Sequence, residues 1–278
     1  MGQCRSRSLP DYDDSDHFDY AYTITSTLGA GGFGTVYSAV HHRTGQKVAV
    51  KKVPRRSVLH LESLDEVPVP REVKLLAGIR HPGIVHLLDF YSLPRHFLMV
   101  LEFLPEWVDL FDYSVQVRYL SEEATRIMMR QLFTTLHYLH SELQIAHLDV
   151  KPENILVEPT SLAIKLIDFG AASPITGSTL SSFEGTRQYA SPDILFRGKF
   201  QPVDADIWAA GVTLYRLVVG RLPFQNPEDY YSQLVFPARN PTVSVFCQHI
   251  IHLMLCRQSD MRPATTLELL NTPWMMQS

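Results

Sequence analysis

The most informative part of this sequence is the run His147-Leu148-Asp149-Val150-Lys151-Pro152-Glu153-Asn154, which is followed by Asp168-Phe169-Gly170. Transfer of a phosphoryl group requires a carboxylate that orients and deprotonates the attacking hydroxyl. It also requires a cation that offsets phosphate charge, and oxygen ligands for Mg²⁺. The run supplies each of these groups. We expect Asp149 to be the base and Lys151 the cation, with Asn154 and Asp168 as metal ligands.

The segment between the two motifs strengthens both. Each motif alone is weak, because an acid in a strand or turn is usually an ordinary structural or surface acid. Here apolar residues at 155–157 and 163–167 predict a hairpin that brings the motifs together. Because further motifs follow in the chain, we disfavour the interpretation of Asp149 and Asp168 as ordinary structural or surface acids.

Composition limits the classes of protein that fit. A length of 278 residues allows one large or two modest domains with a substantial core. A formal net charge of -4 gives no basic surface for nucleic acid, so we expect no such partner. The cysteines Cys4, Cys247 and Cys256 lack disulfide or metal-site spacing, and no apolar run is long enough to cross a membrane. We expect a cytoplasmic protein, and a nuclear location stays open.

Residues 1–21 are polar and contain an acidic run at 11–16, which predicts a flexible, loosely packed tail. The tail starts Met1-Gly2-Gln3-Cys4-Arg5-Ser6, which fits the pattern for N-myristoylation at Gly2. Cys4 offers a site for a second acyl chain, and two chains give stable membrane anchoring where one does not. A chance match to this short pattern is the alternative.

A glycine-rich segment, Leu28-Gly29-Ala30-Gly31-Gly32-Phe33-Gly34, predicts a phosphate-binding loop. Its apolar and β-branched flanks indicate strand–turn–strand, whereas a dinucleotide-binding loop needs a strand followed by a helix. Glycines let the backbone close over phosphates, and Phe33 at the tip shields them from water. We expect Val36 to pack on adenine. A plain glycine-rich hairpin is the alternative, disfavoured by Val48-Ala49-Val50-Lys51 at a suitable distance.

We expect Lys51 to hold the α- and β-phosphates, with Ala49 beside it on the adenine-facing side of a strand. Lys52 is adjacent, so the pattern leaves the choice of lysine open by one residue. The next helix, which includes 71–76, supplies Glu72 as the acid that pairs with Lys51. Glu62 and Glu66 are less suitable, because they precede prolines that delay the helix.

A buried strand at 97–102 puts Leu101 at the back of the nucleotide site. Glu102 begins a connector, residues 102–106, whose backbone faces adenine. Residues 121–142 predict an amphipathic helix with Ser121 as its N-cap. Its expected core face consists of Ile127, Leu132, Leu136 and Leu139.

A segment rich in Ser and Thr, residues 171–190, follows the second motif. Within it, Gly185-Thr186-Arg187-Gln188-Tyr189 resembles the peptide-binding turn of protein kinases, which implies that Thr186 bonds Asp149 and Lys151. Further along, Asp206 opens an apolar helix. The same resemblance implies that Asp206 braces the backbone near His147 and that Asp193 pairs with Arg262.

Together these motifs resemble the protein-kinase superfamily from about Tyr22 to Trp274. Several stretches resemble the Pim group of Ser/Thr kinases, among them Val69-Pro70-Arg71-Glu72-Val73, Asp109-Leu110-Phe111-Asp112, Phe183-Glu184-Gly185-Thr186-Arg187 and Pro273-Trp274-Met275. The resemblance implies a bilobal α+β fold in a single catalytic domain at about 22–275. A sheet with one main helix would form an N-lobe at 22–103, and a mainly helical C-lobe would occupy 104–278. Residues 147–154 are then the catalytic loop, and 171–190 belong to the activation segment.

The resemblance also implies ATP and Mg²⁺ in the cleft, and protein substrates with basic residues before a serine or threonine. The expected nucleotide contacts are Leu28, Gly29, Ala30, Gly31, Gly32, Phe33, Gly34, Val36, Ala49, Lys51, Leu101, Glu102 and Leu156. Substrate arginines would be recognised by Asp109, Asp112 and Glu153. Solvated surface charge is the alternative for these three acids. No oligomer is implied, and we expect a monomer.

Three departures from the family pattern matter. Leu148 replaces the arginine that pairs with a phosphorylated activation segment, so we expect activity without that phosphorylation. Leu104 stands where the Pim connector has a proline, which restores a second adenine-facing hydrogen bond. Asp193 stands where the family has a glutamate, and its side chain is one methylene shorter. The alternatives are a pseudokinase scaffold that binds nucleotide or partners without catalysis, and a small-molecule phosphotransferase.

Overall fold

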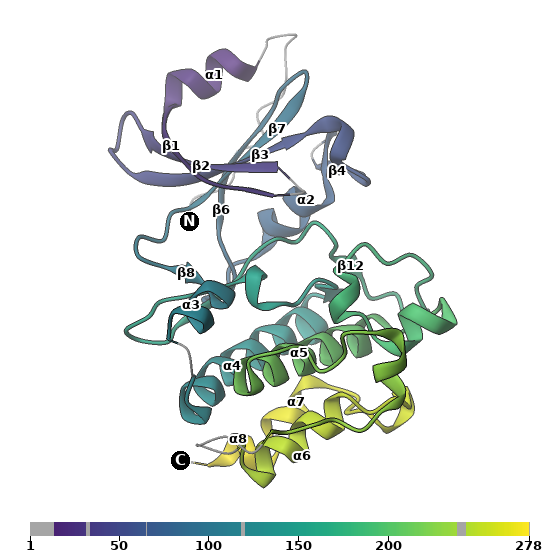
Figure 1. The fold of residues 1–278 in the computed structure, drawn as a ribbon. Coiled ribbons are helices and arrows are strands. Elements are labelled where there is room, and N and C mark those ends of the chain that lie inside the picture. Colours follow the sequence, from purple (N-terminus) through teal and green to yellow (C-terminus); the bar gives the residue numbers. More distant parts are fainter. Residues whose placement is uncertain (1–13, 32–33, 65, 118–119, 238–242, 278) are drawn as a thin grey trace. The chain divides into compact units, whose positions relative to one another are not determined.

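The structure, a computed structural model, describes residues 14–31, 34–64, 66–117, 120–237 and 243–277 (Figure 1). The predicted acylation sites Gly2 and Cys4, and Gly32 and Phe33 of the glycine-rich loop, lie outside the described residues. The chain divides into two compact units, the first ending at Pro105 and the second beginning at Glu106. This division falls inside the predicted connector, slightly later than the expected boundary at 103/104.

The first unit is built on a five-stranded antiparallel sheet in the order β1-β2-β3-β7-β6. Its strands are β1 (Tyr22–Gly31), β2 (Gly34–His41), β3 (Lys47–Pro54), β6 (Leu87–Ser92) and β7 (His96–Glu102). Alternation along β3 turns Val48 and Val50 into a buried cluster with Val100. Ala49 and Lys51 therefore project from the opposite face of the sheet.

A short helix, α1 (Asp14–Ala21), packs on β1 and β6. Its Phe18 is buried, stacking on Tyr22 at 5.4 Å between ring centroids and meeting Tyr91 edge-on at 5.3 Å. The prediction of a loosely packed tail is wrong for residues 14–21. The prediction rested on the polar average composition of the segment and did not take Phe18 into account. Burial of this side chain contributes about 1.5–3 kcal/mol to stability.

The main helix of this unit, α2 (Arg71–Gly78), follows a two-stranded hairpin of β4 (Leu61–Leu64) and β5 (Val67–Pro70). Pro70 occupies the N-cap, so the helix begins where the prolines predict. Glu62 on the hairpin pairs with Arg71 at 3.0 Å and with Lys74 at 2.9 Å. This pairing fixes the hairpin to the helix and leaves Glu72 to face inward.

The second unit is mostly helical. Its helices are α3 (Leu110–Gln116), α4 (Glu122–His137), α5 (Pro202–Val219), α6 (Val245–Met254), α7 (Thr266–Leu270) and α8 (Pro273–Met276). The long helices α4 and α5 are in contact and lie side by side in Figure 1. Buried Phe133 of α4 and Trp208 of α5 are among the large side chains of the core.

Helix α4 begins as predicted, because Ser121 Oγ accepts a hydrogen bond from Ala124 N at 3.0 Å. Leu132, Leu136 and Leu139 are buried as expected. The prediction for Ile127 is wrong, since its side chain is 40% exposed and Met128 fills the core position instead. Adjacent side chains of a helix differ by about 100° in direction. A core position assigned one residue too early, as for Ile127, therefore points toward solvent.

Two small sheets flank the catalytic loop. One contains β8 (Val108–Asp109), β10 (Ile155–Val157) and β11 (Ile164–Leu166), and the other pairs β9 (Ile145–Ala146) with β12 (Ser173–Pro174). The predicted apolar hairpin is therefore present as β10 and β11. An antiparallel sheet in one unit and helices in the other confirm the α+β class. No helix in the described parts of the chain is both long and apolar enough to cross a membrane.

Candidate active site

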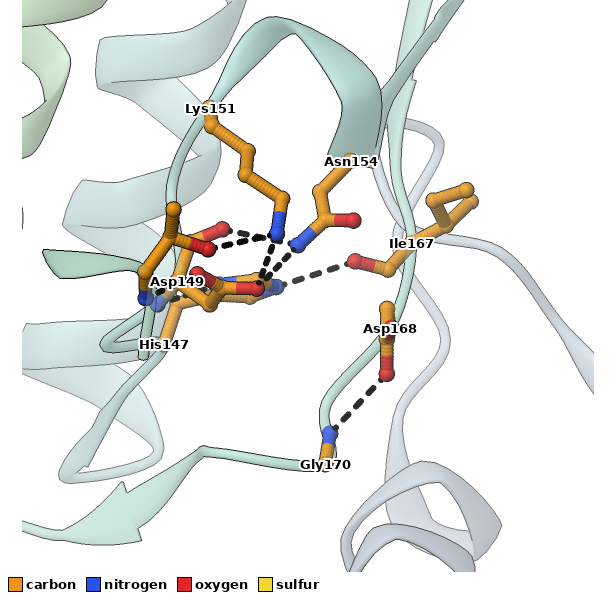
Figure 2. Close-up of polar contacts among 8 residues, drawn as sticks. His147, Asp149, Lys151, Asn154, Ile167, Asp168 and Gly170 are labelled. Carbon is orange, nitrogen blue, oxygen red and sulfur yellow. Dashed lines mark hydrogen bonds and ion pairs between the residues drawn. The ribbon is translucent and has the colours of Figure 1, made fainter. Parts of the chain in front are cut away.

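Asp149 lies at the centre of the catalytic loop and is 4% exposed (Figure 2). Its Oδ2 accepts hydrogen bonds from Lys151 Nζ at 2.8 Å and from Asn154 Nδ2 at 2.7 Å. The same amide nitrogen reaches the Asp149 carbonyl oxygen at 2.9 Å. These contacts hold the carboxylate in one orientation, as a base that must meet a substrate hydroxyl requires.

Thr186 joins the activation segment to this carboxylate. Its backbone N–H donates to Asp149 Oδ1 at 2.8 Å, and its hydroxyl oxygen accepts from Lys151 Nζ at 2.7 Å. Both expected partners are present. The sequence did not indicate that the backbone, rather than the side chain, meets Asp149.

Asp206 of α5 is fully buried and braces the start of the loop. It accepts hydrogen bonds from the backbone N–H groups of His147 at 2.8 Å and Leu148 at 2.7 Å. His140 Nε2 also lies 2.8 Å from its Oδ2. Leu148 has a φ of +62°, an unfavourable conformation for a branched side chain. The brace offsets that cost and aims the next residue, Asp149.

Asp168 follows β11 with a φ of +61° and accepts from Gly170 N at 3.3 Å (Figure 2). Before it, the Ile167 carbonyl oxygen lies 3.1 Å from His147 Nε2. After it, the fully buried Phe169 ring meets the His147 imidazole at 4.8 Å between centroids. His147 thus links the catalytic loop to both neighbours of Asp168.

The residues of this unit fit a magnesium ion. Asn154 uses its amide nitrogen on Asp149, and its oxygen points away from that residue in Figure 2. Amide and carboxylate oxygens are Mg²⁺ ligands, and Mg²⁺ commonly binds one or two carboxylates together with substrate phosphates. Within the described ranges no group of three or more His, Cys, Asp or Glu could hold a metal alone. Asn154 and Asp168 match such a shared site.

In the first unit, Lys51 Nζ lies 2.8 Å from Glu72 Oε1 and 2.9 Å from Oε2. Both residues are less than 10% exposed. Lys52 is partly exposed and alternates to the other face of β3. The structure therefore resolves the ambiguity between the lysines in favour of Lys51 as the partner of Glu72.

The register of the sheet places other predicted nucleotide contacts near Lys51. Val36 of β2 pairs directly with Lys51, and Leu101 of β7 pairs with Ala49. Directly paired residues share a face of a sheet, so these four side chains lie on one side. Glu102 ends β7, and its N–H and its Oε1 both engage His86 in hydrogen bonds of 2.9 Å.

The strands on either side of the glycine-rich turn pair as expected, β1 with β2 from Gly29 with Val36 through Gly31 with Gly34. Ala30 lies in β1, and Leu28 is 49% exposed. Gly34 has a φ of +140°, and a Cβ there would lie 2.2 Å from the Lys52 carbonyl oxygen. Only glycine fits this position. Of the remaining predicted contacts, Leu156 is partly buried in β10 of the second unit.

The acids proposed to bind substrate arginines lie on neighbouring elements of the second unit. Asp109 caps α3, accepting from Asp112 N at 2.8 Å. Burial raises the pKa of Asp109, and the negative charge of Asp112 adds to this rise. Asp112 and Glu153 are exposed, and α3 contacts the 3₁₀ turn Pro152–Asn154 that carries Glu153.

Arg262 pairs with Asp193 at 2.9 Å, as predicted, and also with Asp204, which the sequence analysis missed. Burial raises the pKa of Asp204 from 3.8 to about 6; Arg262 opposes this rise and the charge of Asp193 adds to it. The available signal was the position of Asp204 in the first turn of α5, two residues before Asp206. The second carboxylate supports the shorter Asp193.

Comparison with known proteins agrees with this geometry. The Protein kinase domain family matches residues 22–275. Serine/threonine-protein kinase pim-2 of Danio rerio is 35% identical over 274 residues, 95% of this chain and 87% of that protein. Serine/threonine-protein kinase prk-2 of Caenorhabditis elegans is 34% identical, over 94% of this chain and 59% of the relative.

SNF1-like protein kinase ssp2 of Schizosaccharomyces pombe is 33% identical, over 97% of this chain and 46% of its own length. The chain thus spans about half the length of these last two relatives. The family match covers most of the chain, and the zebrafish relative is matched over most of both sequences. This chain therefore belongs to the eukaryotic protein kinase superfamily, as a Pim-like serine/threonine-protein kinase.

Proposed function

We propose that this kinase transfers the γ-phosphate of ATP to serine or threonine in proteins with basic residues before the acceptor, without phosphorylation of its own activation segment. The observation that carries the proposal is the arrangement around Asp149. One buried carboxylate is held by Lys151, Asn154 and the amide of Thr186. The pseudokinase alternative is disfavoured, because these groups already have the contacts that catalysis needs.

The proposed chemistry divides among groups within each unit. Asp149 orients the acceptor hydroxyl and takes its proton as the hydroxyl oxygen bonds to the γ-phosphorus and the bond from that phosphorus to the bridging oxygen of ADP breaks. Lys151, within reach of Asp149 and Thr186, offsets charge on the transferred phosphoryl group. Lys51, fixed by Glu72, holds the α- and β-phosphates. Asn154 and Asp168 would hold Mg²⁺, which neutralises charge on the leaving phosphates.

A preference for basic substrates is supported by the acids beside the catalytic loop. Asp112 and Glu153 are exposed and lie on elements in contact, close to where an acceptor must approach Asp149. Asp109 adds a third carboxyl at the start of α3. Carboxylates bind guanidinium groups through paired, charge-assisted hydrogen bonds. An arginine-bearing segment is therefore the complementary partner.

Activity without activation-segment phosphorylation is supported by Leu148. An arginine here would need a phosphate as its partner, whereas this leucine is 5% exposed within an apolar cluster. The backbone N–H of Thr186 holds the segment at Asp149 Oδ1, at 2.8 Å.

We further propose a location in the cytoplasm, with membrane association if Gly2 and Cys4 are acylated in a chain translated from Met1. Intact-mass measurement after expression in eukaryotic cells tests the acylation on which membrane association depends. A mass gain equal to a myristoyl group, with or without palmitate, supports it. An unmodified mass for the full population contradicts it.

The substrate preference is tested with three peptides that differ in one feature each: an arginine-rich serine peptide, the same peptide with alanine for arginine, and the same with tyrosine for serine. We expect transfer mainly to the first, unchanged after phosphatase treatment of the enzyme. Glu153→Gln combined with Asp112→Asn should raise KM for that peptide about tenfold. Glu142→Gln, an exposed acid in the same unit, serves as the control. Equal rates on the first two peptides, or loss of activity after phosphatase, contradicts the proposal.

A further inference from the structure

We propose that Leu148 is a positioning residue, which holds the activation segment against the catalytic loop through apolar contact. We call Leu148, Leu180, Phe183 and Phe200 the apolar anchor. The inference deepens the proposed function and rests on it, because it states what replaces a phosphate in ordering the segment. Leu148 touches neither substrate nor nucleotide in this account and acts through its neighbours.

Burial and composition define the anchor. Leu148 and Phe200 are 5% and 3% exposed, and they cluster with the buried Ala146, Ala171 and Ala205. Ile175, Leu180, Phe183 and Ile194 are partly buried against them. A charged side chain at position 148 would lose part of its hydration among these apolar neighbours.

The activation segment is joined to Phe200 by backbone and ring contacts. Leu180 N donates to Phe200 O at 2.9 Å, and Phe200 N donates to Leu180 O at 3.1 Å. The Phe183 ring meets the Phe200 ring edge-on, with centroids 5.9 Å apart. The segment is thus held to Phe200 at Leu180 and at Phe183, shortly before Thr186.

Leu148 also contacts the segment through its backbone. A Cβ on Gly185 would lie 2.1 Å from the Leu148 carbonyl oxygen and 2.7 Å from the Phe183 ring. The catalytic loop and the activation segment can approach each other this closely only because residue 185 is glycine. Leu148 and Gly185 immediately precede Asp149 and Thr186, which share the 2.8 Å hydrogen bond. The anchor therefore fixes both sides of the catalytic contact one residue upstream.

This arrangement differs physically from an anchor of paired charges. A phosphate–arginine pair depends on a modification and is weakened by salt. Apolar packing depends on neither, and responds instead to the volume of the side chains. The order of the segment should therefore withstand phosphatase and high salt, and should be sensitive to truncation of Leu148.

The test compares Leu148→Ala with wild type by amide hydrogen exchange of residues 178–188 and by steady-state kinetics on the arginine-rich serine peptide. We expect at least tenfold faster exchange in this segment and at least a tenfold lower kcat, with KM for ATP within twofold. Leu148→Met, which keeps the volume, should restore both values. Leu180→Ala should shift them in the same direction and tests the anchor from the segment side if Leu148→Ala does not fold.

Leu132→Ala is the matched control for general destabilisation, because Leu132 is also a buried leucine, in α4, and is not in the cluster around Leu148. It should lower Tm while leaving exchange at 178–188 and kcat near wild type. The inference is overturned if Leu148→Ala matches Leu132→Ala in both measurements, or if exchange in the wild-type segment rises after phosphatase or in high salt. If wild type phosphorylates no peptide, the proposed function fails, while the exchange comparison still decides the anchor.

Discussion

The backbone N–H of Thr186 donates a hydrogen bond to Asp149 Oδ1 at 2.8 Å. Asp149, the proposed base, is thereby tied to the segment on which a peptide acceptor would lie. Because the other carboxylate oxygen is held by Lys151 and Asn154, movement of the segment disturbs a fully engaged group. The proposed base and the activation segment are thus coupled through one carboxylate, and we expect loss of order in the segment to lower activity.

Replacing Thr186 with alanine should remove the bond from Lys151 Nζ to the hydroxyl and keep the backbone bond to Asp149. A hydrogen bond to a charged group is worth about 1.5–3 kcal/mol. We expect kcat to fall by about tenfold to a hundredfold, measured with saturating ATP and peptide. Thr186→Ser keeps the hydroxyl and should retain most activity. Equal kcat values for the alanine variant and wild type would count against the contact.

Glu72→Gln should remove the charge of the carboxylate that lies 2.8 Å from the buried ammonium of Lys51. Breaking a buried ion pair costs about 3–5 kcal/mol. We expect a lower Tm and a lower kcat/KM for ATP. Glu62→Gln is the control, since its pairs with Arg71 and Lys74 are more exposed and should contribute about 0–1 kcal/mol. Indistinguishable thermal unfolding of the two variants would contradict this account.

Asp206→Ala should leave the buried N–H groups of His147 and Leu148 without acceptors. Each unsatisfied donor costs about 1–3 kcal/mol, so urea unfolding should show a loss of several kcal/mol. Asp206→Asn keeps one acceptor oxygen, and its loss should be smaller. A smaller loss in the alanine variant than in the asparagine variant is the result that this explanation does not allow.

Asp204 should make stability depend on pH. Its pKa is about 6 in the folded chain, chiefly through burial, against 3.8 for the ordinary carboxyl. The folded state therefore binds this proton more tightly, and the contribution is full below about pH 4 and lost as pH rises through 6. The difference in Tm between wild type and Asp204→Asn should be more favourable to wild type at pH 5 than at pH 7. A difference that is constant or grows with pH refutes this assignment.

Much of the site follows from the sequence, because its chemistry needs fixed residue types at short spacings. The partners of Asp149 and the pair of Lys51 with Glu72 were expected from motifs that resemble those of protein kinases. The α+β class was implied by the same resemblance. The start of α2 after Pro70 follows from local pattern, because the prolines delay the helix.

Other features depend on contacts between distant segments and could not be read from the pattern. Helix α1 is held by contacts of Phe18 with Tyr22 and Tyr91. The polar composition of residues 1–21 does not reveal these contacts, so the sequence predicted a loosely packed tail. Arg262 gains Asp204 only when α5 packs beside it. The sequence indicated that Leu148 replaces an arginine, and only the fold shows that Leu148 clusters with Phe200.

The most direct test of the central claim is phosphate transfer from ATP, with Mg²⁺ present, to the arginine-rich serine peptide by wild type and by Asp149→Asn. Asparagine keeps the shape of the side chain and an acceptor for Thr186 N, but cannot take the proton. With general-base catalysis worth about 10²–10⁴-fold, wild type should transfer phosphate and the variant should lose at least that factor while still binding ATP. Equal rates in the two proteins, or no transfer by either despite ATP binding, would contradict the assignment of Asp149 as the catalytic base.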